Sequence, residues 1–128
     1  MKKILLIGGS GFLGSHVARR LAAQGHCLTV PTRHRERARH LIVLPTVEVV
    51  ETDVHDDARL AELVAGQDAV INLVGILHSR YGLPYGRVFA RAHVDLPRRI
   101  AAACRAAGVR RVIHVSALNA DVNGPSQY

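Results

Sequence analysis

Short aliphatic runs alternate along the chain with segments in which apolar residues recur every three or four positions. The runs are typical of strands buried on both faces of a parallel sheet, and the periodic segments of helices that pack on it. We predict five strands, over residues 2–7, 27–32, 47–51, 69–73 and 111–115. Because strands and helices alternate, these patterns indicate an α/β fold with a doubly wound parallel sheet, strand order 3-2-1-4-5 and right-handed crossovers.

Helices are predicted over residues 11–24, 57–64 and about 87–107, with a short, very basic helix or loop over residues 33–41. In the first helix Leu13, Val17 and Leu21 recur at four-residue spacing, so we expect them to face the sheet. Pro97 should bend or split the long helix near Asp95, because proline lacks the N–H that continues a helical ladder.

Five other residues are assigned structural roles. Pro31 cannot donate to a sheet ladder, so we place it at the carboxyl end of the second strand, where pairing stops. Asp56 and Asp57 stand at the start of the helix over residues 57–64 and are interpreted as N-capping residues, not as a catalytic carboxylate pair. Cys27 and Cys104 form no CxxC pair and are expected to be reduced thiols.

A glycine-rich loop, residues 8–14, joins the first strand to the first helix. In such a unit Gly8 lets the chain turn sharply, Gly11 leaves room for a dinucleotide pyrophosphate, and Gly14 lets the helix pack closely on the sheet. The unpaired N–H groups and the dipole at the helix start then face the phosphates. The spacing and its context predict a Rossmann-type domain over residues 1–128 that binds a dinucleotide.

The end of the second strand bears on which dinucleotide is bound. In NAD(H)-binding domains an acidic residue about 20 residues after the glycine loop bonds the ribose 2′-hydroxyl. This chain has Thr32, Arg33, His34 and Arg35 there. The Arg33 guanidinium can pair with a 2′-phosphate, so we favour NADP(H) over NAD(H). The alternative is a solvated basic helix, since the arginines at positions 35, 37 and 39 alternate and cannot all reach one phosphate.

Composition and charge narrow the remaining possibilities. The chain has 128 residues, 48% of them hydrophobic, which suits one domain with a buried sheet. Its formal net charge of +7 favours anionic partners, but no aromatic residues stand among the arginines, so nucleic acid is not expected. No apolar run approaches the roughly 20 residues of a membrane span, and no signal peptide precedes the first strand, so we expect a cytoplasmic protein. The eight histidines show no HxxxH or HExxH spacing, and no metal site is predicted.

Several short stretches together resemble one family. They are the loop with its GxxGxxG spacing and residues 53–54, 70–76, 112–120 and 125–128. The whole chain is similar to the N-terminal part of extended or atypical short-chain dehydrogenases/reductases of the NAD-dependent epimerase/dehydratase type. Within this group it resembles the nucleotide-binding accessory subunit of respiratory complex I and its bacterial relatives. The resemblance implies a protein partner in a respiratory or assembly complex, and a peripheral place at the inner membrane.

The resemblance also implies roles for individual residues. The glycine loop would bind the pyrophosphate, residues after the third strand the adenine, and residues after the fourth strand the ribose and nicotinamide. A serine and a tyrosine would carry the hydroxyl–carbonyl chemistry. On this basis the cofactor-binding residues are Gly8, Ser10, Gly11, Phe12, Leu13, Gly14, Asp53, Val54, Leu73, Val74 and Gly75, and the catalytic pair is Ser116 and Tyr128.

The resemblance leaves the activity open. In the family a lysine four residues after the tyrosine lowers the tyrosine pKa, and that position lies beyond Tyr128. We therefore expect an N-terminal fragment of a larger fold that binds a nucleotide without turning over a substrate. Three hypotheses remain: a domain of an oxidoreductase or epimerase-like enzyme, a non-catalytic accessory or assembly subunit, and an NADP(H)-sensing regulator.

Overall fold

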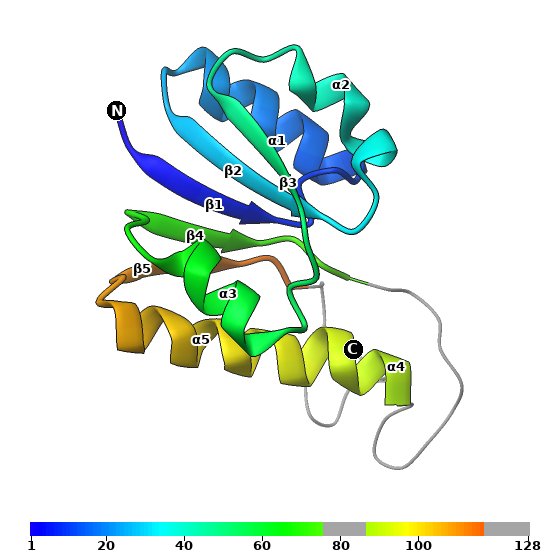
Figure 1. Cartoon of the computed structure of the whole chain (residues 1–128), viewed down its shortest axis with the longest axis vertical. Coiled ribbons are helices and arrows are strands. Elements are labelled where there is room, and N and C mark those ends of the chain that lie inside the picture. The colour runs from blue at the N-terminus through cyan, green and yellow to red at the C-terminus, as the bar shows by residue number, and fades with distance from the viewer. Residues whose placement is uncertain (76–86, 117–128) are drawn as a thin grey trace.

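The computed structural model describes residues 1–75 and 87–116, in which five parallel strands form one sheet (Figure 1). The strands are β1 (Lys3–Ile7), β2 (Cys27–Thr32), β3 (Val47–Glu51), β4 (Ala69–Asn72) and β5 (Arg111–His114). Their order is β3-β2-β1-β4-β5, which confirms the predicted topology. Because β1 lies between β2 and β4, the strand order reverses at its carboxyl end.

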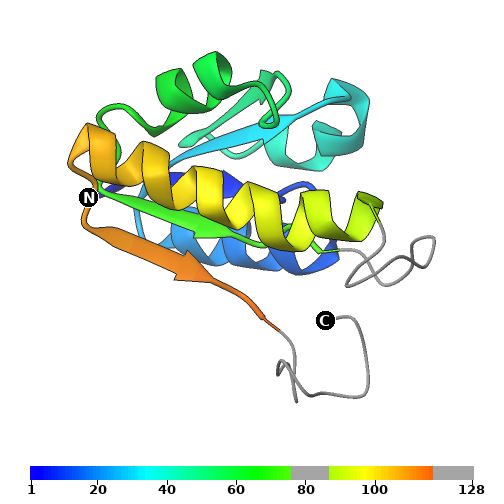
Figure 2. The same cartoon turned by 90° about the horizontal axis from the view of Figure 1, so that it is seen from below.

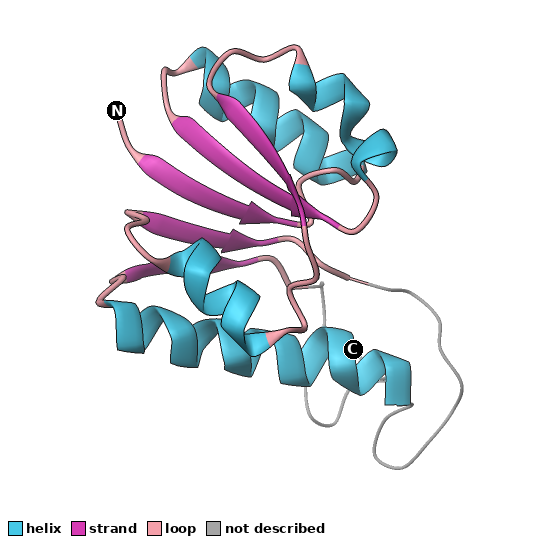
Figure 3. Ribbon diagram, viewed as in Figure 1, coloured by secondary structure: helices cyan, strands magenta, loops and turns pink. Residues whose placement is uncertain are grey.

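Helices cover both faces of this sheet (Figure 3). One face carries α1 (Phe12–Ala23), the 3₁₀ turn η1 (Arg35–Ala38) and α2 (Arg39–Ile42). The other carries α3 (Asp57–Val64) and α5 (Leu96–Ala107), and α5 is preceded by α4 (Arg87–Ala90) and the π-helical turn η2 (Arg91–Asp95). None of the helices in the described part of the chain is both long enough and apolar enough to cross a membrane.

The packing of β1 explains why its aliphatic run has no polar interruption. Ile4 and Leu6 belong to the buried cluster that contains α1 and α2 residues, whereas Leu5 and Ile7 belong to the cluster that contains α3 and α5 residues. Side chains alternate between the two faces of a strand, so a strand covered on both sides has apolar residues at every position.

The inward face of α1 differs from the prediction in its first turn. Gly14 and Ala18 are buried and Val17 and Leu21 are partly buried, but Leu13 is 48% exposed. The helix begins against the glycine loop, and this close approach leaves room on the inner side for glycine alone. Leu13, one position earlier, therefore points toward solvent.

The prediction that pairing stops at Pro31 is right for one neighbouring strand and wrong for the other. β2 pairs with β1 through Thr29 but with β3 through Thr32, and Pro31 lies opposite Val50. The Leu28 N–H and the Thr32 carbonyl both bond toward the β3 side, so the backbone of Pro31 faces the β1 side. Pairing with β1 has already ended there, and the missing N–H costs no ladder bond.

The segment over residues 87–107 is helical throughout, and Figure 2 shows it as one continuous rod with β5 at the edge of the sheet beside it. Its geometry changes at Asp95, where the π-helical turn η2 ends and α5 begins, with Pro97 in the first turn of α5. Proline supplies no N–H to the helical ladder, so the regular α-helix restarts around it. The helix therefore changes near Asp95, as predicted, but by a switch from π-helical to α-helical geometry and not by a break.

Candidate functional site

The carboxyl ends of β1, β2 and β3 surround a cavity of about 200 Å³. Its walls come from the glycine loop, the turn after β2, the loop after β3, the segment after β4 and the start of α5. The predicted residues that line it together are Gly8, Ser10, Arg33, Asp53, Val54 and Val74. In open parallel sheets, ligands bind in the crevice outside the strand carboxyl ends where the strand order reverses.

Two positions of the loop exclude any residue larger than glycine. Gly8 has a φ of +82°, and a Cβ there would lie 2.9 Å from the Leu73 carbonyl carbon and from the Val74 nitrogen. A Cβ on Gly14 would lie 2.3 Å from the carbonyl oxygen of Gly8. Gly14 therefore lets α1 pack closely on the glycine loop.

The start of α1 is open to an incoming group. Gly11 is the N-cap residue and offers no side-chain cap, and the nearest atom to a Cβ built on it is 3.5 Å away. The first turn of the helix contains no acidic residue, and Phe12 and Leu13 in this turn are exposed. The helix's own side chains therefore leave the first-turn N–H groups and the positive dipole end available to an anion.

A serine–histidine contact joins α1 to α2. The Ser15 hydroxyl donates to the Gly11 carbonyl at 2.6 Å, and the same oxygen lies 2.6 Å from Nε2 of His40. Since the Ser15 proton is already donated, the His40 Nε2–H is the donor to Ser15. Through Ser15, this contact links the glycine loop to α2 and so fixes the position of α2 relative to the loop.

A buried threonine shapes the basic turn after β2. The Thr32 hydroxyl donates to the His34 carbonyl at 3.1 Å and accepts from the His34 N–H at 3.3 Å. The turn brings Arg33 and Arg37 to the cavity, whereas Arg35 donates to a backbone carbonyl of β3 at 3.1 Å. Sequence reasoning identified Arg33 but missed His34 and Arg37, although the four-residue spacing of the two arginines would place them on one side of a helical turn.

Asn72, buried at the end of β4, positions the segment that follows it. Its Oδ1 accepts from the Val74 N–H at 3.1 Å, and its Nδ2 donates to Nδ1 of His114 on β5 at 3.1 Å. The Leu73 N–H donates to the carbonyl of the last β1 residue at 2.8 Å. These bonds fix the backbone of Leu73 and Val74 against Gly8 of the glycine loop.

One member of the predicted catalytic pair falls within the described residues. Ser116 lies two residues after β5 and is exposed, and Tyr128 lies outside the described residues. Gly75, at the end of the segment after β4, is also exposed. The roles of these three residues stay predictions.

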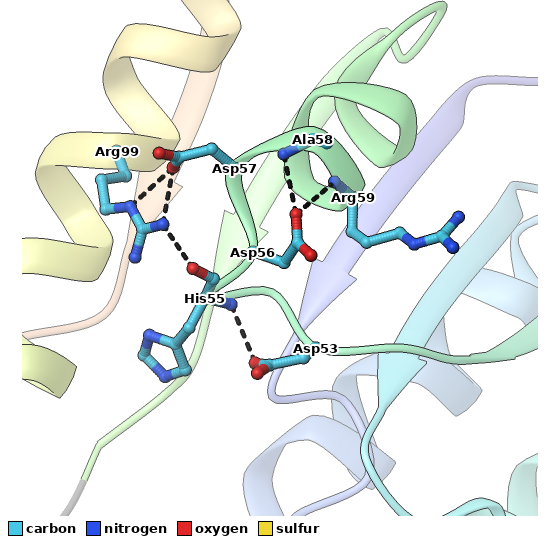
Figure 4. Close-up of polar contacts among 7 residues, drawn as sticks. All are labelled: Asp53, His55, Asp56, Asp57, Ala58, Arg59 and Arg99. Atoms are coloured by element: carbon cyan, nitrogen blue, oxygen red, sulfur yellow. Dashed lines mark hydrogen bonds and ion pairs between the residues drawn. The ribbon is translucent and has the colours of Figure 1, made fainter.

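Three carboxylates and one arginine hold the loop between β3 and α3 (Figure 4). The Asp53 carboxylate accepts from the His55 N–H at 2.9 Å. Asp56 accepts from two N–H groups in the first turn of α3, at 3.0 and 3.3 Å, which confirms it as the N-cap. Arg99 of α5 donates to Asp57 at 2.7 Å and, through a second nitrogen, to the His55 carbonyl.

His55, which was not predicted from the sequence, is also among the residues that line the cavity. Burial lowers the pKa of His55 below its ordinary value of 6.5; Arg91 and Arg99 lower it further, and Asp53 opposes them. The ring is therefore mainly neutral at pH 7, and its Nδ1 is buried with no hydrogen-bond partner in the part of the chain that the structure describes. His55 could have been proposed from the sequence, because it directly follows Asp53 and Val54 at the carboxyl end of a predicted strand.

The lowered pKa of His55 makes the stability of the chain depend on pH. Between the folded and unfolded pKa values the unfolded chain binds more protons, so the free energy of unfolding should fall as the pH drops below about 6.5. His55→Gln should reduce this fall, and His16→Gln, at an exposed histidine, is the matched control. Urea unfolding at about pH 7.5, 6.5 and 5.5 measures it. The same pH dependence in His55→Gln and in the wild type would contradict the effect of burial on His55.

Comparison with known proteins relates this arrangement to a family. The model of the NAD dependent epimerase/dehydratase family matches residues 4–127. The chain is 33% identical over 126 residues to the mitochondrial NADH-ubiquinone oxidoreductase 40 kDa subunit of Neurospora crassa, across 96% of this chain and 32% of that protein. It is 32% identical over 126 residues to mitochondrial NADH dehydrogenase (ubiquinone) 1 alpha subcomplex subunit 9 of Mus musculus, across 95% of this chain and 32% of that protein. The chain thus spans about a third of the length of these relatives.

Solved structures share the fold. A double mutant of dTDP-glucose 4,6-dehydratase from Streptomyces venezuelae, with NAD bound, superposes with a TM-score of 0.73 at 28% identity, over 88% of this chain and 38% of that one. A UDP-glucose-4-epimerase from Stenotrophomonas maltophila, also with NAD bound, gives a TM-score of 0.76 at 22% identity, over 91% of this chain and 37% of that one. The second likeness concerns the fold alone.

Proposed function

Because the chain belongs to the NAD-dependent epimerase/dehydratase family, we propose that the cavity at the carboxyl ends of β1, β2 and β3 binds a NAD(P)(H) dinucleotide. The observation that carries this proposal is the form of the glycine loop. Gly8 and Gly14 admit no side chain, and the space at Gly11 lies in front of the uncapped helix start. A pyrophosphate in that space would accept hydrogen bonds from the first-turn N–H groups.

The proposed orientation follows the strand order on either side of the loop. The pyrophosphate lies against Ser10, Gly11 and the first turn of α1, and the adenosine extends toward Asp53 and Val54. The nicotinamide half extends toward residues 73–75 and Ser116, on the side of β4 and β5. The bound dinucleotide would supply hydride transfer, and Ser116 together with Tyr128 would hold the substrate oxygen and its proton in the whole protein.

We further propose that the site prefers NADP(H). Arg33 and Arg37 both line the cavity after β2, where an NAD(H) site would carry a carboxylate. Asp53 lies in the loop after β3, and its Oδ1 already accepts the His55 N–H. Two guanidinium groups with no carboxylate at the end of β2 suit a 2′-phosphate better than a ribose 2′-hydroxyl.

Arg33→Ala is expected to weaken NADPH binding about tenfold and to leave NADH binding nearly unchanged, because one charge-assisted contact to the 2′-phosphate is removed. Titration calorimetry of the purified chain with each nucleotide measures both affinities. Arg19→Ala, on the exposed side of α1, removes the same charge away from the cavity and is the matched control.

Three outcomes of this titration differ in meaning. Equal affinity of the wild type for NADPH and NADH would contradict the preference but not the dinucleotide site. A similar loss of NADPH affinity in Arg19→Ala and Arg33→Ala would assign the effect to net charge. Failure of a folded chain to bind either nucleotide would contradict the proposed function itself.

For the whole protein we propose an oxidoreductase or an epimerase-like enzyme of the cytoplasm. The second candidate is a non-catalytic accessory or assembly subunit, peripheral at the inner membrane and bound to a respiratory partner. The likeness to two relatives named as subunits of NADH–ubiquinone enzymes favours the second candidate. Native electrophoresis of membrane extracts tests it: co-migration of the whole protein with a respiratory complex supports the subunit, and free migration with nucleotide-dependent turnover supports the enzyme.

A further inference from the structure

Two anchors hold the basic turn after β2, one before it and one after it. The first is Thr32, buried at the end of β2, whose hydroxyl makes two hydrogen bonds with the backbone of the turn. The second is His40 of α2, whose Nε2 lies 2.6 Å from the hydroxyl oxygen of Ser15. Because η1 runs directly into α2, Arg33 and Arg37 lie between the two anchors.

The contact between His40 and Ser15 extends to the glycine loop. The Ser15 hydroxyl donates its proton to the Gly11 carbonyl at 2.6 Å, so it accepts the Nε2–H of His40. The Ser15 N–H donates to the same carbonyl at 2.8 Å. Gly11 is the N-cap residue of α1, at the place proposed for the pyrophosphate. A chain of hydrogen bonds therefore runs from α2 through the first turns of α1 to the glycine loop.

The apolar packing of α2 does not define this relation as closely. Ala38 and Leu41 on either side of the helix start are fully buried in the cluster that also contains Ala18 of α1. Apolar contacts of this kind are non-directional, whereas a hydrogen bond fixes both a distance and a direction. The bond from His40 is thus the contact that sets where the basic turn stands relative to the loop.

This relation matters for a ligand that reaches both places. NADPH carries two anionic groups joined through one ribose, the pyrophosphate and the 2′-phosphate. The proposed site holds the first at the glycine loop and the second at Arg33 and Arg37. Both groups bind at full strength only when the two parts of the site stand at the matching separation. NADH lacks the 2′-phosphate, so its binding does not depend on that separation.

We propose that His40 is a positioning residue for the preference between NADP(H) and NAD(H). Through Ser15 it holds the basic turn at the separation from the glycine loop at which one dinucleotide reaches both. His40 is not among the residues that line the cavity, so it acts through Ser15 and not by touching the nucleotide. The inference rests on the proposed dinucleotide site and on its proposed preference for NADP(H).

The test compares the affinities of the 128-residue chain for NADPH and NADH, measured by titration calorimetry. His40→Leu should weaken NADPH binding about fivefold and NADH binding less than about twofold, so the ratio of the two affinities falls. His40→Gln keeps an N–H donor at this place and should restore most of the ratio. His26→Leu, at a histidine that bonds the Lys2 N–H away from the cavity, is the matched control and should keep the wild-type ratio.

Ser15→Ala tests the path from His40 to the loop. It removes the acceptor of the His40 bond, so the affinity ratio should fall as it does in His40→Leu. The double variant should show no further fall, because both changes break the same contact. Falls that add in the double variant would show that His40 acts by another route, and they overturn the inference. Ser15→Ala also supplies the comparison with the wild type if His40→Leu does not fold.

The outcomes separate this inference from the proposed function. A lowered ratio in His40→Leu that returns in His40→Gln supports it. An unchanged ratio in folded His40→Leu, or an equal loss of affinity for both nucleotides, overturns the role of His40 while the dinucleotide site stands. Equal binding of NADPH and NADH by the wild type overturns that role together with the preference. Failure of the folded wild type to bind either nucleotide overturns the proposed function itself.

Discussion

Gly14→Ala is expected to abolish dinucleotide binding and to lower the free energy of unfolding by about 2–3 kcal/mol. The new Cβ would lie 2.3 Å from the Gly8 carbonyl oxygen and 2.5 Å from the Gly9 Cα, and these are backbone atoms that cannot rotate aside. The loop must move away from α1, and the first-turn N–H groups lose their alignment with the pyrophosphate. Urea unfolding measures the loss of stability, and calorimetry with NADPH measures the loss of binding.

Two other glycines supply the controls for Gly14→Ala. Gly25→Ala places a Cβ in open space at a φ of +85°, so it should cost about 1–2 kcal/mol of backbone strain and leave the affinity unchanged. In Gly11→Ala the new Cβ would lie 3.5 Å from its nearest neighbour, the Gly8 carbonyl oxygen, so this variant should fold normally. Its methyl group would nevertheless occupy the space proposed for the pyrophosphate. Wild-type affinity in Gly14→Ala would show that the loop does not hold the nucleotide.

Asn72→Ala is expected to lower the free energy of unfolding by about 2 kcal/mol and to weaken binding of the nicotinamide half. Asn72 is 1% exposed, and its loss leaves the N–H of the partly buried Val74 and Nδ1 of His114 without the partner that Asn72 supplies. The segment over residues 73–75 is then less firmly held against the glycine loop. The affinity for NADPH should fall more than the affinity for ADP, because ADP does not extend to that segment.

Asn72→Asp is the matched variant for this position. It keeps an acceptor for the Val74 N–H but removes the donor to His114, so it should retain most of the NADPH affinity while losing stability. An equal loss of NADPH and ADP affinity in Asn72→Ala would indicate a general loss of structure and contradict a role for Asn72 in positioning residues 73–75.

The strands were predictable because their signal is local. A buried parallel strand needs apolar residues on both faces, and the run that ends at Ile7 meets this need without reference to the rest of the chain. The first turn of α1 was not predictable in this way. Leu13 fits the apolar spacing of the helix, but the glycine loop brings the helix start so close that Gly14 takes the inner position and Leu13 is exposed.

In the candidate site, too, some residues could be predicted from the sequence and others could not. The glycine spacing and the absence of an acid after β2 can be recognised in the printed sequence, and they point to Gly8, Gly14 and Arg33. His55 has no such pattern. Its Nδ1 is buried without a partner among the described residues, and its carbonyl accepts a hydrogen bond from Arg99 of another helix. Neither feature can be inferred from the spacing of residues along the chain.

By itself, the sequence determined the order of strands and helices, the glycine loop at the first crossover and the family, because each depends on residues close together in the chain. The tertiary structure alone decided which residues share the cavity, that Asn72 bonds His114, and that burial lowers the pKa of His55, whose Nδ1 has no hydrogen-bond partner among the described residues. These features arise where the carboxyl ends of separate strands meet. There the distances between side chains are set by the packing of the helices on the sheet, and not by their positions along the chain.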